Sequence, residues 1–179
     1  MRELYYYSDK PSLAPHLLLV ETQIFYALSL VDRSSNAQKY VVLNAPGYIP
    51  TLVNDDLVLF ESPANCIYIC ELDTSSRFIP PLGDSNRSLF FQWLAYLNNT
   101  LQAEYMLWRY SETYTTDAKS IAGIKAAQDQ CLTGIFILLD EELRKKKGLI
   151  QITRFWCYHG FHGQELSQSL QTGSFDRAF

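Results

Sequence analysis

The chain opens with the stretch YYYSDKPSLAPH, in which a serine is bounded by two prolines. Ser12 lies between Pro11 and Pro15, where an aromatic run gives way to apolar residues at near-helical spacing. A serine at a helix start can act as the N-cap, and a hydroxyl donor beside the free N–H groups of a helix start stabilises an anion. Pro15 falls in the first helical turn, where its missing N–H costs little. The stretch is therefore a candidate for anion chemistry.

The segment NAPGYIPTL carries a second candidate, because Ile49 precedes Pro50 there. An X–Pro bond adopts the cis form at a cost of about 0.5–1 kcal/mol, against about 3 kcal/mol for other residues. A cis bond would turn the backbone groups of Ile49 outward, where an extended peptide can pair with them as an added strand. An ordinary Gly-x-x-Pro turn is the alternative interpretation.

A third candidate is FESPANCIYI, in which Glu61 and Ser62 end a predicted strand and begin a predicted helix. Ser62 is expected to cap this helix, with Pro63 at the first helical position. The free N–H groups and the dipole of a helix start favour an anion. Glu61 either takes part in such a site or only supports the cap.

Cysteine and histidine side chains give a weaker signal. Without a CxxC motif, buried reduced thiols are expected at the four cysteines, Cys66, Cys70, Cys131 and Cys157. The tail segment CYHGFH brings Cys157, His159 and His162 together, but a closed zinc site needs four ligands and no other cysteine is adjacent in sequence. No metal is expected.

Hydrophobic patterning places the three motifs on an α/β half. A strand, a helix and a second strand are predicted within about thirty residues, the order of a parallel crossover unit. A hairpin and another helix follow. The predicted elements are residues 3–7, 12–22, 25–31, 49–53, 57–60 and 62–72. The apolar face of the last helix is expected to include Ala64, Ile67, Tyr68 and Leu72.

Beyond PPLGDSN, residues 80–86, the patterning becomes helical. Apolar stripes at helical spacing run along residues 89–110 and 121–147, and the basic residues 144–147 suit a helix end. An α/β domain over residues 1–79 is thus expected to be followed by a linker and a helical domain over residues 87–179, irregular after about residue 148.

Composition limits the function classes. The chain has 179 residues, of which 47% are hydrophobic, enough for a substantial core. Its net charge of -4 and its lack of a long basic run argue against a nucleic-acid or polybasic membrane surface. No stretch approaches the roughly 20 apolar residues of a membrane span, so a cytoplasmic protein is expected.

The three motifs, in this order and spacing, resemble the glutathione S-transferase family, and most closely its bacterial beta class. SLAPH matches the N-terminal pattern of the beta class, NAPGYIPTL resembles the family's NPxGxVPxL, and FESPANCIYI resembles its ESxAIxxYI. The resemblance covers residues 3–72 and continues as helix pattern alone over residues 89–148. It implies a thioredoxin-like domain with a mixed four-stranded sheet and helices, followed by an all-helical C-terminal domain.

The resemblance also implies roles for residues. Those that would bind glutathione are Ile49 and Pro50 for the cysteinyl part, and Glu61 and Ser62 for the γ-glutamyl group. Ser12 would be the catalytic donor to the bound thiolate. Tyr6 is a second candidate donor, although at least one of the three adjacent tyrosines must be core. The residues that would line a pocket for the electrophile are Gln102, Tyr105, Trp108 and Arg109, but aromatic stripes at helical spacing are also typical of core or dimer contacts.

The sequence departs from the beta-class pattern in several places. Pro11 stands where that class has a redox cysteine, so mixed-disulfide chemistry should be absent, and the preceding turn lacks the family's glycine. Gln102 replaces a histidine often found at that position. After LLDEELRKKKG no capping-box helix follows, which indicates a truncated and remodelled C-terminal domain or a reading frame lost near Lys147.

The expected function is therefore conjugation of glutathione, as co-substrate, to small apolar electrophiles by thiolate stabilisation. The resemblance implies a cytoplasmic homodimer that acts in detoxification without a cofactor. The alternative is a non-catalytic relative that binds glutathione, another ligand or a protein. A thioredoxin-type disulfide oxidoreductase is disfavoured, because no cysteine lies near the first predicted helix.

Overall fold

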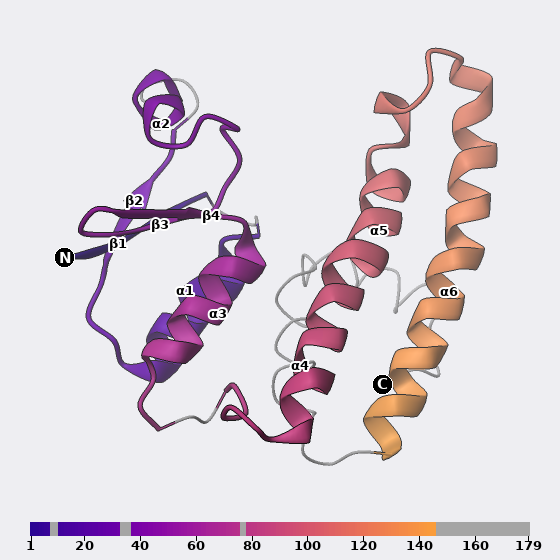
Figure 1. Cartoon of the computed structure of the whole chain (residues 1–179). Helices are drawn as coiled ribbons and strands as arrows, with labels where there is room; N and C mark the ends of the chain where they lie inside the picture. The colour runs from indigo at the N-terminus through magenta and orange to yellow at the C-terminus, as the bar shows by residue number, and fades with distance from the viewer. Residues whose placement is uncertain (8–10, 33–36, 76–77, 146–179) are drawn as a thin grey trace.

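The computed structural model describes residues 1–7, 11–32, 37–75 and 78–145. Its N-terminal half is an α/β domain (Figure 1). In chain order the elements are β1 (Arg2–Tyr6), α1 (Leu13–Thr22), β2 (Ala27–Leu30), α2 (Ala37–Leu43), β3 (Thr51–Asn54), β4 (Leu57–Phe60) and α3 (Ser62–Leu72). The predicted strands, hairpin and two helices are present, and α2 is additional.

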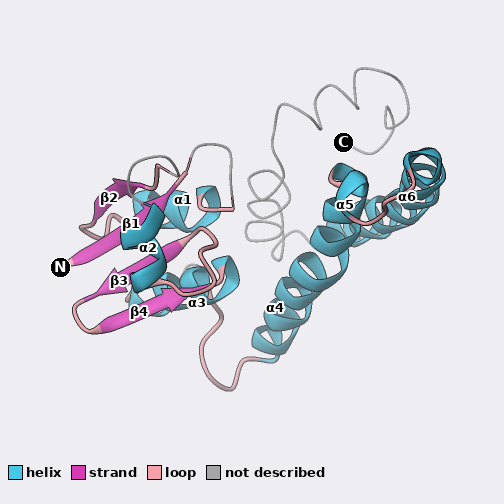
Figure 2. Ribbon diagram, turned by 90° about the horizontal axis from the view of Figure 1, so that it is seen from above, coloured by secondary structure: helices cyan, strands magenta, loops and turns pink. Residues whose placement is uncertain are grey.

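The four strands form one mixed sheet in the order β2-β1-β3-β4. β1 and β2 are parallel, whereas β3 is antiparallel to both β1 and β4. Helices α1 and α3 cover one face of the sheet, and α2 lies on the other (Figure 2). Leu4 and Leu52 of the central strands are buried in one core with Leu19 and Ile69 of the covering helices. The predicted mixed four-stranded sheet with helices is thus confirmed.

Helix α2 is not predicted by the hydrophobic pattern. It has seven residues and leaves Val41 and Val42 exposed, so it shows no apolar stripe. The two β-branched valines also lower its intrinsic helix propensity. The helix is held by Tyr40, whose buried ring packs against the ring of Tyr5 on β1. Tertiary contact, which a sequence pattern does not contain, stabilises this element.

The predicted apolar face of α3 is not the most buried one. The buried residues are Ser62, Asn65, Cys66, Ile69 and Cys70. The residues predicted for the apolar face are only partly buried, although Ile67 and Tyr68 pack against the core: Ala64, Ile67, Tyr68 and Leu72. Apolar residues surround this helix, so several stripes fit its pattern equally well. The true inward face carries two polar side chains, which a hydrophobic criterion rejects.

The second half is mainly helical. Its elements are α4 (Ser85–Tyr96), a π-helical turn η1 (Leu97–Leu101), α5 (Gln102–Arg109), the short turns η2 (Ser111–Thr113) and η3 (Ala118–Ser120), and α6 (Ile121–Lys145). The segment from α4 to α5 forms one long rod, and α6 returns beside it (Figure 1). α4 begins earlier than the apolar stripe indicates, because the Asp84 carboxylate accepts a hydrogen bond from the N–H of Asn86 at 2.8 Å.

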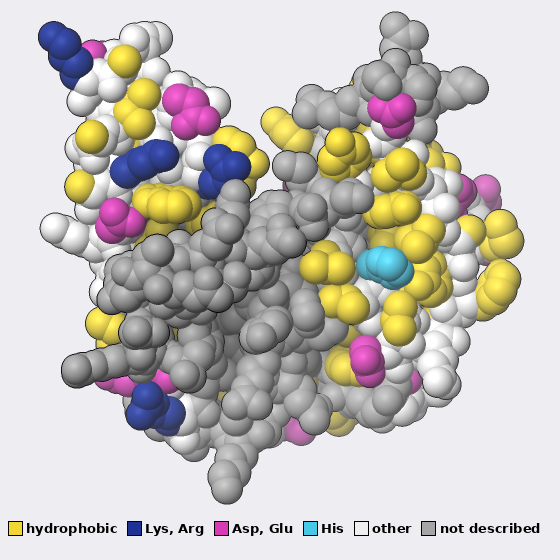
Figure 3. All heavy atoms as spheres, turned by 180° about the vertical axis from the view of Figure 1, so that it is seen from behind, with side chains coloured by type: hydrophobic (Ala, Val, Ile, Leu, Met, Phe, Trp, Pro, Cys, Tyr) yellow, Lys and Arg dark blue, Asp and Glu magenta, His cyan; other side chains and the backbone are white. Residues whose placement is uncertain are grey.

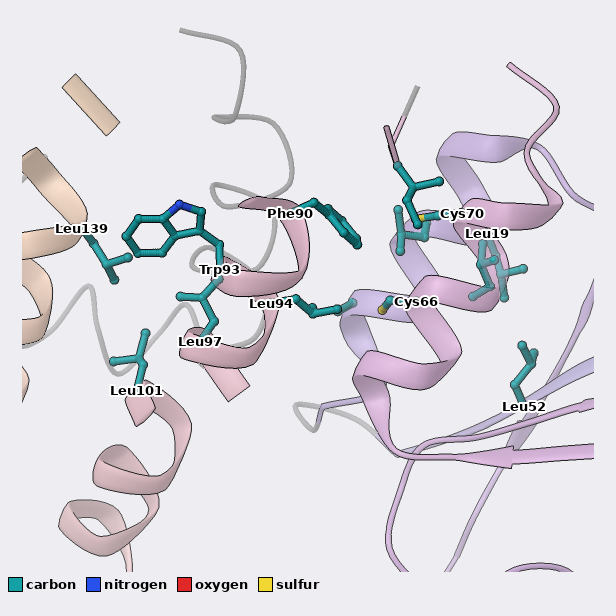
Figure 4. Packing of buried hydrophobic residues seen from close by; sticks show 14 of the residues in the cluster. Leu19, Leu52, Cys66, Cys70, Phe90, Trp93, Leu94, Leu97, Leu101 and Leu139 are labelled. Carbon is teal, nitrogen blue, oxygen red and sulfur yellow. The ribbon is translucent and has the colours of Figure 1, made fainter. Parts of the chain in front are cut away.

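Helix α4 connects the two halves of the chain, because one of its faces packs against α3 and another against α6. Leu94 points toward Cys66 of α3, whereas Trp93 and Leu97 lie on the side of Leu139 of α6 (Figure 4). All five residues belong to one hydrophobic cluster that runs from the sheet to α6. The start of α3 is therefore coupled to the helical half by packing.

The structure leaves some of the predictions untested. The CYHGFH metal candidate and the irregular tail lie outside the described residues. The division into a domain over residues 1–79, a linker and a domain over residues 87–179 stays a prediction. Within the described part, no helix is long and apolar enough to cross a bilayer, and no three metal-ligating side chains gather.

The cysteines divide into two environments. Cys66 and Cys70 are buried and free of disulfides, as expected. Burial raises the pKa of the Cys66 thiol well above its ordinary value and that of Cys70 to about 12. Cys131 is exposed, so the predicted burial is wrong there, because the residue lies on α6 next to buried Leu132 but on the solvent side. Cys157 lies outside the described residues.

Thiol titration of the folded protein should distinguish these environments. Because the thiolate is the reactive form, Cys131 is expected to react rapidly with an aromatic disulfide reagent, and Cys66 only on unfolding. Cys131→Ser should remove about one rapidly reacting equivalent, whereas the matched variant Cys66→Ser should remove none. Rapid reaction of Cys66 in the folded protein would contradict its burial.

Candidate functional site

The register of the sheet brings the three sequence motifs to one end. Tyr5 pairs with Thr51, and Thr51 pairs with Phe60. Pro50 precedes Thr51 and Glu61 follows Phe60, so both lie at the end of the sheet where β1 finishes. Helices α1 and α3 also begin at this end (Figure 2). Three motifs that are far apart in sequence thus meet at one edge.

The starts of α1 and α3 are held together by a hydrogen bond. The hydroxyl of Ser62, which is buried, donates to the backbone oxygen of Pro11 at 3.0 Å. The first N–H groups of a helix have no partner within it, and the dipole is positive at that end. Two such ends held side by side favour an anionic ligand.

The start of α3 differs from the predicted cap. Glu61 is the residue at the N-cap position, Ser62 is the first residue of the helix and Pro63 the second. The Glu61 side chain makes no capping hydrogen bond, and the Ser62 hydroxyl is used by Pro11. The predicted serine cap is therefore wrong, because a carbonyl from the α1 side lies within reach of Ser62.

Glu61 has an unusual backbone conformation. Its φ of 70° and ψ of 119° lie outside the regions that L-residues favour. Such conformations persist where the surrounding structure over-determines them, and they cluster at binding sites. The Glu61 side chain is exposed, so its carboxylate is available to a cationic group at the end of the sheet.

Ser12 is at the N-cap position of α1, but its side chain does not cap the helix. Its backbone is helical, and its hydroxyl donates to the Tyr7 carbonyl at 3.0 Å and accepts from the Tyr7 N–H at 3.4 Å. The side chain therefore ties the end of β1 to the start of α1, with 2% of the residue exposed. The predicted side-chain cap is wrong because Tyr7, brought close by the turn, uses the hydroxyl. Contact of Ser12 with bound sulfur stays a prediction.

Tyr6 lies on the α1 side of the sheet. Its ring is 6.4 Å from that of His16, which in turn makes an edge contact with Tyr26 at 5.8 Å. Burial lowers the pKa of His16. Figure 3 shows that hydrophobic side chains gather on this face of the α/β half. Both residues thus have a packing role, and donation by Tyr6 to a ligand stays a prediction.

The Ile49–Pro50 peptide bond is cis, as predicted. Among the described residues, the backbone N–H and C=O of Ile49 have no hydrogen-bond partner. The preceding carbonyl, that of Tyr48, accepts hydrogen bonds from Tyr40 and Asn44. The sequence gives no role to these two residues, since Tyr40 lies in the unpredicted α2. The one available signal is the position of Asn44 at the start of the NAPGYIPTL motif.

The residues predicted to line an electrophile pocket all lie on α5: Gln102, Tyr105, Trp108 and Arg109. The rings of Tyr105 and Trp108 stack with centroids 6.0 Å apart, and both pack against the core. The ammonium of Lys125 on α6 lies 5.6 Å from the centre of the Trp108 ring, so this indole faces α6. Arg109 lies over the ring of Tyr110. A role in a pocket stays a prediction for all four.

Comparison with known proteins shows what the chain is similar to. Residues 3–71, which form the α/β half, match the glutathione S-transferase N-terminal domain. A curated relative, glutathione S-transferase hmp2 from Hypomyces subiculosus, is 27% identical over 143 residues. The aligned region covers 73% of this chain and 66% of that protein, so the chain spans just under two thirds of its relative.

Solved glutathione S-transferases share the fold of both halves. BphK, a bacterial enzyme of the family solved as a ternary complex, aligns with 94% of this chain and 84% of its own, with a TM-score of 0.76 and 24% identity. A beta-class transferase from Sphingomonas chungbukensis aligns with 98% of this chain and 96% of its own, with a TM-score of 0.68 and 20% identity. The predicted resemblance to glutathione S-transferases and the thioredoxin-like fold with a helical second half are confirmed.

Proposed function

We propose that this protein binds glutathione at the end of the sheet and conjugates it to small apolar electrophiles. The observation that supports this proposal is the convergence of an open backbone segment at Ile49 with the starts of α1 and α3. An extended tripeptide with a carboxylate, an ammonium group and a thiol matches that set of groups.

Each part of glutathione has a partner of suitable chemistry in this proposal. The N–H and C=O of Ile49 pair with the cysteinyl residue as an added strand. The α-carboxylate of the γ-glutamyl group lies at the start of α3, where the N–H of Ser62 points out of the helix. The exposed carboxylate of Glu61 meets the ammonium group. No cofactor takes part.

The proposed chemistry is stabilisation of the glutathione thiolate. A free thiol has a pKa near 8.5, so only a few per cent is ionised at neutral pH. The start of α1 and the hydroxyl of Ser12 would stabilise the anion, which then attacks the electrophile without a covalent enzyme intermediate. For this, the hydroxyl of Ser12 must transfer its hydrogen bond from the Tyr7 carbonyl to the sulfur.

A second candidate function is binding of glutathione without turnover. The observation in its favour is the position of the Ser12 proton, which the Tyr7 carbonyl already accepts in a buried setting. Pro11 also removes the redox cysteine of the beta-class pattern. A carrier or protein-binding relative would keep the Ile49 and α3 contacts and lose the chemistry.

Calorimetry with glutathione, followed by a conjugation assay with an aryl halide, tests both candidates. Loss of a hydrogen bond to a charged group costs about 1.5–3 kcal/mol, so Ser12→Ala should lower kcat/KM by about tenfold or more. The matched variant Ser88→Ala, at an exposed serine of α4, should leave kcat/KM unchanged.

The outcomes separate the candidates. Binding with turnover that falls in Ser12→Ala supports the transferase, provided that thermal denaturation shows the variant to be folded. Binding of glutathione without any turnover selects the carrier. A wild-type protein that does not bind glutathione at millimolar concentration contradicts both.

We further propose a homodimer that acts in the cytoplasm in detoxification, as the similarity to glutathione S-transferases suggests. The structure supports the dimer with an apolar surface on the edge strand β4, where Leu57, Val58 and Phe60 are exposed. An edge strand with such side chains is suited to burial against another chain.

A further inference from the structure

A closed ring of hydrogen bonds lies behind the Ile49 segment. The Asn44 amide nitrogen is 2.7 Å from the Tyr48 carbonyl oxygen and 2.9 Å from the Thr51 hydroxyl. The Tyr40 hydroxyl is 2.6 Å from the same carbonyl and 2.7 Å from the Thr51 hydroxyl. The three side chains come from α2, from the loop that follows it and from β3, and they are at most 5% exposed.

The available protons fix the direction of each bond. A carbonyl only accepts, so Tyr40 gives its single proton to Tyr48. Thr51 must then donate to the Tyr40 oxygen. Asn44 has two amide protons, which suit its two shorter contacts, to Tyr48 at 2.7 Å and to Thr51 at 2.9 Å; its contact with the Tyr40 hydroxyl is longer, at 3.3 Å. The Tyr48 carbonyl thus accepts two bonds. The bonds that join Tyr40, Asn44 and Thr51 to one another are buried, whereas the two bonds to the Tyr48 carbonyl are partly buried.

Fixing the Tyr48 carbonyl also fixes the next N–H group. The Tyr48 C=O and the Ile49 N–H belong to one planar trans peptide, in which the two groups point in opposite directions. Two hydrogen bonds hold the carbonyl toward the ring, so the Ile49 N–H is directed away from it. This N–H has no partner among the residues that the structure describes.

We propose that Tyr40, Asn44 and Thr51 are positioning residues that hold the Ile49 N–H in place as the donor to a carbonyl of glutathione. The inference rests on the proposed binding of glutathione at Ile49. It goes further because it states that three side chains that do not touch glutathione raise the affinity of the protein for it. Their removal should weaken binding without changing the groups that bind.

The test compares Tyr40→Phe and Thr51→Val with wild type by calorimetry with glutathione. Each variant keeps the approximate size of the side chain and removes one hydroxyl from the ring of hydrogen bonds. The Kd for glutathione should therefore rise by up to about tenfold. Thr51→Ser keeps the hydroxyl and should retain most of the affinity. Where turnover is present, KM for glutathione should rise while kcat at saturation stays close to that of wild type.

Tyr68→Phe is the matched control. The Tyr68 hydroxyl accepts a hydrogen bond from Asn54 at 2.7 Å, and Asn54 ends β3 at the opposite end of the sheet. This variant therefore removes a comparable bond from the same domain. It should lower the thermal midpoint to a similar extent as Tyr40→Phe and leave the Kd unchanged.

The outcomes are distinguishable. Wild type that does not bind glutathione contradicts the proposed function, and the positioning role with it. Wild type that binds, with Tyr40→Phe and Thr51→Val binding equally well, contradicts the positioning role alone. Equal weakening in Tyr68→Phe also contradicts it, since general destabilisation would then explain the loss. An amide NMR signal of Ile49 that shifts on titration with glutathione in wild type, and less in Tyr40→Phe at equal concentration, supports it.

Discussion

Truncation of Leu94 to alanine is expected to lower the free energy of unfolding by about 2–5 kcal/mol. Leu94 is 6% exposed and points from α4 toward Cys66 on α3 (Figure 4). Removing its branched end leaves a cavity between two long helices, which relax only in part. The loss therefore includes a cavity contribution in addition to the lost transfer free energy.

Chemical denaturation followed by tryptophan fluorescence measures the effect, because Trp93 is buried beside Leu94. The matched control is Leu82→Ala, which removes the same atoms from a residue that is 88% exposed and should change the stability by less than about 0.5 kcal/mol. An equal loss of stability in both variants would contradict the packing of α4 on α3. Leu94 packs on α3, and the start of that helix at Ser62 is proposed to bind glutathione. The affinity for glutathione should therefore also fall in Leu94→Ala.

Local signals in the sequence were sufficient for most of the α/β half. Prolines, a turn between two strand-like runs and alternating apolar residues predicted the strands, the hairpin and the cis bond before Pro50. They failed for α2, which is short and has no apolar stripe. They also failed for the inward face of α3, because burial there includes Ser62 and Asn65, whose places depend on contacts made by the folded chain.

The candidate site was predictable in its location but not in its hydrogen bonds. The three motifs fall at one end once the register is known, because two of them flank the antiparallel strands β3 and β4 and the third joins the end of β1 to the start of α1. The partners of Ser12 and Ser62 depend on which carbonyl comes within about 3 Å, a distance that no spacing in the sequence contains. The ring behind Ile49 was missed for the same reason, since it joins residues of the unpredicted α2 to β3.

Replacement of Asn65 by leucine is expected to raise the free energy of unfolding by about 1–3 kcal/mol. Asn65 is completely buried, and neither its amide nitrogen nor its amide oxygen has a hydrogen-bond partner. Burying an amide without partners costs free energy that an apolar group does not. Leucine branches at the same atom as asparagine and carries two methyl groups in place of the nitrogen and oxygen, so it fits with little rearrangement. The family pattern ESxAIxxYI, with isoleucine at the position of Asn65, also indicates room for an aliphatic side chain.

Thermal and chemical denaturation test this expectation, with Asn99→Leu at an exposed position of η1 as the matched control. That control should change the stability by less than about 0.5 kcal/mol. A less stable Asn65→Leu variant would contradict the expectation. The Kd for glutathione is a second measurement. It should not change, because the backbone N–H of Asn65 still donates to the Glu61 carbonyl in the variant. A stabilised variant with unchanged affinity would show that the start of α3 binds glutathione through its backbone. It would also show that the Asn65 side chain destabilises the fold and does not take part in the site.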